Sequence, residues 1–280
     1  APTVSNSTVA GTNATLVAGA NGTSTITVQL KDVNGNNLTF SDGTITFDAL
    51  STGLGSLGSV VDNGNGTYSV TYTAGTVAGP VVLTPKLNGT AFTNPLTITI
   101  LPAAASLTNN VITTTSTSVV AESNDTRVIT VQLKDAYGNN LISSGGTLTF
   151  ASLATGAGSI GTVTDNNNGS YTATYTVGTT VGTVTASPSL GGSALTNTLD
   201  FTVTAPASAA NSIVTASLAS VVANGGVVTF TVNLRNGNNQ PLTSSGGTVT
   251  FTSSSPDTGN GSITSVVNNG NGSYTATFTG

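Results

Sequence analysis

Carboxylic acids are the side chains of this 280-residue chain best able to do chemistry, because it contains no Cys and no His. Triads and dyads built on either residue are therefore excluded, as are thiolate metal sites. Acid–base catalysis needs paired carboxylates in a cleft, whereas an Asp in a turn usually caps its own backbone. We therefore expect no catalytic residue and no cofactor, since most of the ten acids fall in predicted turns; they are Asp32, Asp42, Asp48, Asp62, Glu122, Asp125, Asp135, Asp165, Asp200 and Asp257.

Calcium is the metal that these acids could bind, since it needs only hard oxygen ligands, and three or more converging carboxylates would suit it. The acidic positions that recur along the chain lose their charge in the last copy: Asp32 and Asp135 become Asn236, and Asp62 and Asp165 become Asn268. Turn capping accounts for all four acids without a metal. We favour capping and expect no metal site.

Lysines and aromatic residues each have a chemical and a structural interpretation. A Lys–Asn isopeptide bond requires a lysine buried beside a carboxylic acid, but Lys31 and Lys134 fall on the polar face and Arg235 takes the third position. Aromatic faces could stack on sugars, yet these residues recur with the spacing of core side chains. We predict that they are core residues: Tyr68 and Tyr72, Tyr171 and Tyr175, and Tyr274 and Phe278.

These residues belong to a stretch that occurs three times. A glycine–asparagine turn leads into a strand at residues 63–73, and the same pattern returns at 167–176 and 269–279. Its first tyrosine recurs at equal intervals as Tyr68, Tyr171 and Tyr274. The chain is therefore predicted to be a tandem array with modules at residues 1–102, 103–205 and 206–280.

Alternation of apolar and polar residues predicts strands with one buried face. A short first strand is expected at residues 16–18, with copies at 119–121 and 221–223. The next strand buries an apolar set in each module: Ile26, Val28 and Leu30; Ile129, Val131 and Leu133; and Phe230, Val232 and Leu234. A further strand carries Ile45 and Phe47, then Leu148 and Phe150, then Val249 and Phe251. About seven short strands per module and no helical periodicity predict an all-β fold of Ig-like antiparallel sandwiches arranged as an extended rod.

The third module has no counterpart of the last two strands of the others, which lie at residues 81–83 and 96–100 in module 1. An unfinished sandwich exposes core and an open edge. Two interpretations stay open: the array continues beyond this segment, or another subunit supplies the missing strand by β-augmentation.

Composition excludes several classes of function. Only 5% of residues are charged, and Asp and Glu outnumber Lys and Arg ten to five, so no basic patch could bind nucleic acid. Apolar residues make up 37% of the chain and alternate strictly, which favours an ordered fold over disorder. No apolar run is long enough to span a membrane and no signal peptide is visible. The lack of Cys says little about compartment.

The pattern resembles the bacterial Ig-like repeats of invasin- and intimin-type surface adhesins. The residues that carry the resemblance are those at 28–36, at 43–47 and at 62–68, with counterparts in all three modules. The segment around Gly66, Thr67 and Tyr68 is also similar to filamin-type Ig repeats, and module 3 departs by placing Arg235 and Asn236 where the others have Lys–Asp. The resemblance implies extracellular stalks or fibres that hold an adhesive tip away from a bacterial cell surface.

We interpret the chain as a non-enzymatic stalk or fibre that spaces or polymerises outside the cell. The linkers at residues 101–105 and 204–207 are short and carry a proline, which limits bending. Its expected partners are neighbouring modules or subunits, through strand complementation at module 3 in the second interpretation above. The alternative is a module that binds a host receptor or glycan directly, for which the loop at residues 253–260 is the candidate.

Overall fold

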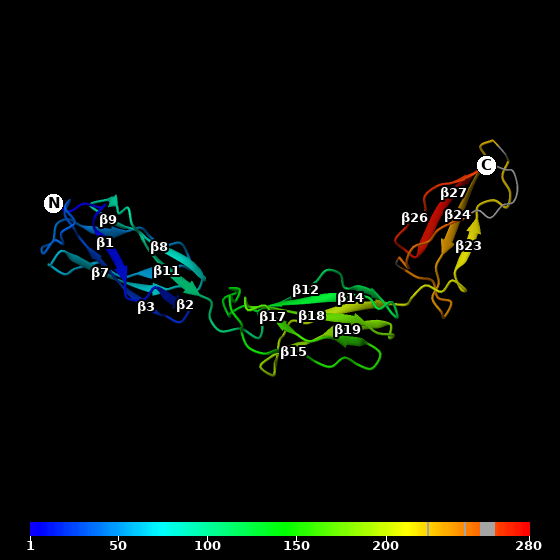
Figure 1. Cartoon of the computed structure of the whole chain (residues 1–280), viewed down its shortest axis with the longest axis horizontal. Helices are drawn as coiled ribbons and strands as arrows, with labels where there is room; N and C mark the ends of the chain where they lie inside the picture. Colours follow the sequence, from blue (N-terminus) through cyan, green and yellow to red (C-terminus); the bar gives the residue numbers. More distant parts are fainter. Residues whose placement is uncertain (223, 244, 253–260) are drawn as a thin grey trace.

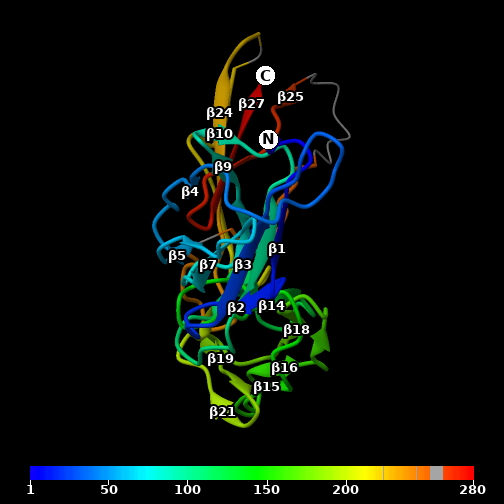
Figure 2. The same ribbon diagram turned by 90° about the vertical axis from the view of Figure 1, so that its left-hand side faces the viewer.

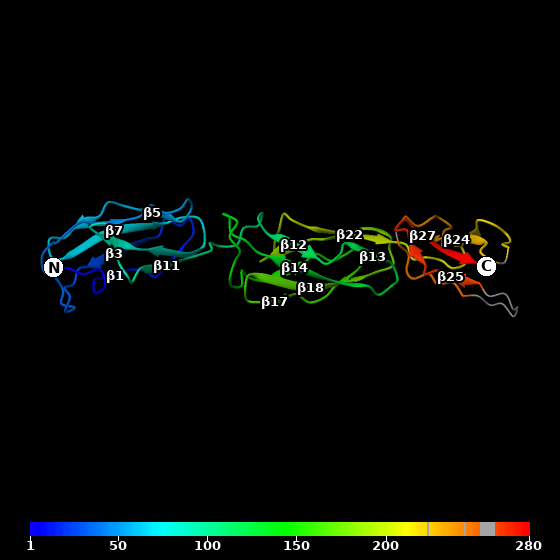
Figure 3. The same ribbon diagram turned by 90° about the horizontal axis from the view of Figure 1, so that it is seen from above.

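The computed structural model describes residues 1–222, 224–243, 245–252 and 261–280, and these form three modules in a row. The N-terminus lies at one end of the long axis and the C-terminus at the other (Figure 1). The view from above keeps the modules in one line, whereas the end-on view shows module 2 displaced to one side of module 1 (Figures 2 and 3). Every regular element of the described residues is a strand, and none of these residues forms a helix able to cross a membrane.

Module 1 contains eleven strands. They are β1 Thr8–Gly11, β2 Thr15–Val17, β3 Thr23–Gln29, β4 Ile45–Phe47, β5 Gly55–Leu57, β6 Val61–Asp62, β7 Thr67–Ala74, β8 Gly79–Leu83, β9 Pro85–Leu87, β10 Thr90–Ala91 and β11 Leu96–Leu101. One sheet has the order β1-β3-β7-β5, with β6 also paired to β7. Two smaller sheets, β10-β9-β4 and β2-β11-β8, form the opposite layer.

Module 2 repeats this arrangement strand for strand. Its elements are β12 Val111–Thr114, β13 Ser118–Val120, β14 Thr126–Gln132, β15 Leu148–Phe150, β16 Gly158–Ile160, β17 Thr164–Asp165, β18 Ser170–Val177, β19 Gly182–Ala186, β20 Pro188–Leu190, β21 Ser193–Ala194 and β22 Leu199–Thr204. The sheets β12-β14-β18-β16, β15-β20-β21 and β13-β22-β19 match those of module 1.

The described part of module 3 keeps only the larger sheet. Its strands are β23 Ile213–Ala216, β24 Val227–Asn233, β25 Ser262–Ile263, β26 Val267–Asn268 and β27 Ser273–Thr279. The order β23-β24-β27-β25, with β26 also on β27, matches the first sheet of the other modules.

The alternating residues form the cores as predicted. Ile26, Val28 and Leu30 have at most 1% of their surface exposed, while the alternate residues Thr25 and Thr27 face outward. The same parity buries the three counterparts in module 2. Each module packs its apolar side chains around its own centre, because the buried clusters do not cross the linkers.

Three details differ from the sequence prediction. A strand precedes the one expected first: β1, β12 and β23 pair with the alternating strand in each module. The pairs β2–β11 and β13–β22 are parallel, although every other strand pair is antiparallel in the described ladders. Periodicity reveals which face of a strand is buried but says nothing about its direction.

The third difference is in module 3, where two predicted strands are not formed. Residues Val221 and Val222 have no strand structure, Ala223 lies outside the described residues, and the segment of Val249 and Phe251 is also irregular. In modules 1 and 2 these segments pair with β11 and β9 or their copies, and no such partner strands occur in the described part of module 3. A strand without a partner leaves its backbone groups unpaired, so the two segments stay irregular.

Candidate functional site

The turn after β3 is organised by one aspartate. The Asp32 carboxylate accepts hydrogen bonds from the backbone N–H of Asn34 and Asn36, both at 2.9 Å, and from the Asn36 Nδ2 at 3.1 Å. Gly35 supplies the left-handed conformation that the turn requires, with φ of 80°. The acid therefore closes the turn and also fixes the Asn36 side chain.

Module 2 builds the same turn in a buried setting. Asp135 is fully buried, and its carboxylate accepts from the N–H of Tyr137 and Asn139 at 2.9 Å, from the Asn139 Nδ2 at 2.8 Å and from the linker N–H of Ala103 at 3.0 Å. Burial raises the pKa of Asp135, but the hydrogen bonds from Asn139, Ala103 and Tyr137 outweigh it and hold the pKa below its ordinary value of 3.8. The linker is thereby tied to the turn.

Module 3 closes the turn without a charge. The Asn236 Oδ1 accepts from the N–H of Asn238 and Gln240, both at 3.0 Å, and its Nδ2 donates to the Gln240 Oε1 at 3.2 Å. An amide therefore suffices for the fold of the turn. Capping by Asp32 and Asp135 matches the sequence prediction, and the described residues contain no group of three acids that could hold a metal ion.

Acid should weaken the two charged turns selectively. Because the folded pKa of Asp135 lies below 3.8, its contribution to stability is present above that value and is lost as pH falls through the folded pKa. We expect the stability of module 2 to fall between about pH 5 and pH 2, and Asp135→Asn to flatten that dependence. The measurement is hydrogen exchange of module 2 peptides across this pH range.

Module 3 supplies the matched control for this prediction. Asn236→Asp is expected to give module 3 a new loss of stability in acid, because the introduced carboxylate can accept the same two N–H groups. Equal pH profiles for wild type, Asp135→Asn and Asn236→Asp would contradict the assignment.

In modules 1 and 2, a second acid closes the loop beside the recurring tyrosine, Tyr68 or Tyr171. Ser144 donates to Asp165, and the Tyr171 hydroxyl donates to Gly146 O at 2.7 Å while accepting from the Gly145 N–H at 2.9 Å. The serine hydrogen bond is the main cause that lowers the pKa of Asp165, and Ser41 does the same for Asp62. These contacts bind one loop to the sheet.

The five tyrosines predicted as core residues are buried: Tyr68, Tyr72, Tyr171, Tyr175 and Tyr274. The prediction is wrong for Phe278, which is half-buried because the described part of module 3 has no second sheet to cover it. Tyr72 and Tyr175 are fully buried, and the Tyr175 hydroxyl donates to Ala157 O at 2.8 Å. The Tyr175 ring stacks on Phe201 of the opposite layer with 4.3 Å between ring centroids. Buried rings have no face open to a sugar. Lys31 and Lys134 are half-buried at the ends of their strands, outside the buried apolar sets.

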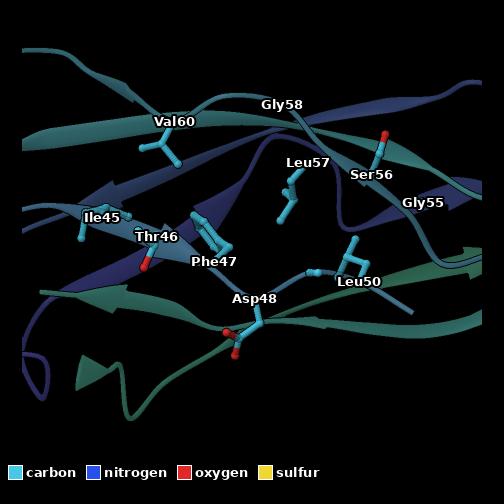
Figure 4. A pocket seen from close by; sticks show the side chains of 11 residues that line it. Ile45, Thr46, Phe47, Asp48, Leu50, Gly55, Ser56, Leu57, Gly58 and Val60 are labelled. Atoms are coloured by element: carbon cyan, nitrogen blue, oxygen red, sulfur yellow. The ribbon is translucent and has the colours of Figure 1, made fainter. Parts of the chain in front are cut away.

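An open groove runs along one side of module 1, between the edges of β4 and β5. Phe47, Leu50, Leu57 and Val60 point into it, whereas Asp48, its only charged lining residue, points away (Figure 4). The groove encloses about 510 Å³, and its copy in module 2 encloses about 580 Å³ between Phe150, Leu153, Ile160 and Val163. Because both modules have it, the groove follows from the unpaired edges of the sandwich.

The junction between modules 1 and 2 brings together residues that the sequence did not single out. The Asn139 Nδ2 donates to Thr76 O at 2.8 Å, and the Asn139 Oδ1 accepts from the Ala78 N–H at 3.0 Å. Beside it, the Tyr137 hydroxyl lies 3.5 Å from Gly19 O. The signal available in the sequence is Tyr137, an aromatic residue in a turn where modules 1 and 3 have Asn34 and Asn238. The loop at 253–260, the sequence candidate for binding, lies outside the described residues.

Tandem sandwiches joined end to end by such turns define the class of Ig-like repeat rods found in adhesins. The chain belongs to the family described as invasin, domain 3, whose model matches residues 3–103, 106–206 and 208–280. This agrees with the resemblance to invasin-type repeats.

Solved structures show the same fold. The Escherichia coli adhesin FdeC is 24% identical, with 100% of this chain and 89% of that chain covered and a TM-score of 0.58. Yersinia pseudotuberculosis InvD is 24% identical, with 85% and 72% covered and a TM-score of 0.54. Invasin, a bacterial integrin-binding protein, is 22% identical, with 84% of this chain but only 57% of that chain covered and a TM-score of 0.53. No curated protein sequence matches this chain.

Proposed function

We propose that this chain is a spacer segment of an extracellular protein on a bacterial surface, which holds another part of that protein at a distance from the cell. The observation that carries the proposal is the end-to-end order of the modules, with the two termini at opposite ends of the long axis (Figure 1). The buried aromatic rings and the acids committed to turns support a non-enzymatic role. We retain the module boundaries at residues 102 and 205 as part of this proposal.

Excision of residues 103–205 tests the spacer role. Because the copy of each turn lies at the same place in each module, module 3 can follow module 1 in the shortened chain. We expect small-angle X-ray scattering to show a longest dimension shorter by one module and a rod-like profile before and after excision. A compact particle in either chain would contradict the proposal.

Direct binding of a host receptor is the second candidate, and the likeness to invasin, described as integrin-binding, is what favours it. A binder should attach saturably to host cells as the isolated chain, whereas a spacer should not. Cell-binding titrations with the labelled chain separate the two roles.

Strand complementation at module 3 is a further proposal about partners. Among the described residues of module 3, the buried cluster consists of Val232, Leu234 and Tyr274, and Val222 and Val214 expose more than half of their surface. A strand from another subunit could cover this face. Light scattering that finds only monomers at high concentration would contradict it.

A further inference from the structure

The second junction has the same parts as the first but lacks its hydrogen bonds among the described residues, although the ends of modules 2 and 3 line one open pocket between Val181, Thr204 and Pro241. The turn at residues 235–241 takes the place of the turn at 134–140, with Gln240 where module 2 has Asn139 and Asn238 where it has Tyr137. At the first junction Asn139 forms two hydrogen bonds with the backbone of module 1. Among the described residues of the second junction, no hydrogen bond joins module 2 to module 3.

The end of each module that faces the next one is called its base; in module 1 it includes Gly19, Thr76 and Ala78. The residue at the position of Gly19 differs between modules 1 and 2. Gly19 has φ of 66°, and a Cβ added there would lie 2.0 Å from the Tyr137 hydroxyl oxygen. Glu122 occupies the same place in module 2, with φ of 62° and the same kind of backbone hydrogen bond. The Tyr137 ring therefore fits the base of module 1 only because that position is glycine.

Asp135 prepares this contact, because it holds the Asn139 Nδ2 at 2.8 Å and leaves the amide aimed at Thr76 and Ala78. Both linkers are short and each contains one proline, Pro102 or Pro206, but the first is also tied to the turn through the Ala103 N–H bond to Asp135. Hydrogen bonds at two points and a ring beside them resist rotation about a linker, whereas a linker alone does not.

We propose that the turn at residues 134–140 is a docking surface specific for the base of module 1, and that it fixes the angle of the first junction. Asn139 and Tyr137 make the contact, and Asp135 is a positioning residue. The chain bends instead at the second junction, around residues 204–207. This inference holds whether the rod acts as a spacer or as a binder.

Distance measurements between spin labels test the proposal on the full chain, because the absence of Cys allows labels at chosen positions only. Exposed Val61, Val128 and Val267 lie in modules 1, 2 and 3. We expect the Val61→Cys/Val128→Cys pair to give a distance distribution at least twofold narrower than the Val128→Cys/Val267→Cys pair. Equal widths for the two pairs would overturn the proposal.

Variants identify the residues that hold the junction. Asn139→Ala combined with Tyr137→Ala should broaden the first distribution to the width of the second. Asn36→Ala is the matched control, because Asn36 has the same position and the same bonds to its own aspartate but touches no other module in the described structure. It should leave both distributions unchanged, and hydrogen exchange should show modules 1 and 2 folded in every variant. An unchanged width in the double variant would refute the docking surface.

Discussion

Replacing Tyr175 with alanine is expected to destabilise module 2 by about 3–5 kcal/mol, the range for deleting a large aromatic side chain from a core. The Tyr175 ring is fully buried and stacks on Phe201 at 4.3 Å, so its loss removes contacts from both layers of the sandwich. The hydroxyl bond to Ala157 O at 2.8 Å is lost as well. The change in the free energy of unfolding is measured in urea, with hydrogen exchange of module 2 peptides as the readout.

Two further variants separate the contribution of the hydroxyl bond from that of ring burial. Tyr175→Phe removes only the hydroxyl bond and should cost about 1 kcal/mol. Phe278→Ala deletes the counterpart in module 3, which is half-buried, and should cost less than Tyr175→Ala because a partly open site leaves a smaller cavity. Equal losses of stability in all three variants would contradict the claim that burial of the Tyr175 ring contributes most of the effect.

Replacing Gly169 with alanine should have the next largest effect, about 2–4 kcal/mol, since it combines backbone strain with a clash. Gly169 has φ of 80°, and an added Cβ would lie 2.2 Å from the backbone oxygen of Leu141. Its own carbonyl accepts from the Leu133 N–H at 2.9 Å and from the Gln132 Nε2 at 3.1 Å. A shift that relieved the clash would therefore disturb both bonds.

Gly192 is the matched control in the same module. It also has positive φ, 85°, but no atom lies within 4 Å of an added Cβ. Gly192→Ala should therefore show only the cost of the left-handed conformation, about 1 kcal/mol. Equal losses in the two variants, measured by urea unfolding, would mean that the approach to Leu141 has no energetic consequence.

The sequence predicts the cores of this chain better than its edges. Strict alternation at Ile26, Val28 and Leu30 allows only one face to be buried, and the structure agrees. The first strand, β1, was missed because Thr8–Gly11 contains small residues and no alternation of large ones. The strands expected around Val221 and Val249 are not formed, because a strand needs a neighbouring strand to pair with. The alternation of residues within one segment does not reveal which strands lie beside it.

The candidate site was predicted only in part. Aspartate in a turn implies capping, which Asp32 and Asp135 perform. What Asn139 does could not be predicted, because its partners Thr76 and Ala78 belong to another module and are distant in sequence. Contacts between folded units depend on how those units meet, and periodicity within one unit carries no information about that.

The parallel pairing of β2 with β11 has a mechanical consequence. The chain enters module 1 through β1, continues into β2 and leaves from β11, and β2 and β11 are paired side by side through Thr15, Leu16 and Val17. Tension on the two termini pulls such parallel neighbours in opposite directions along their length, so their hydrogen bonds are loaded together in shear and not opened one at a time. The parallel pairing of β13 with β22 loads module 2 in the same geometry.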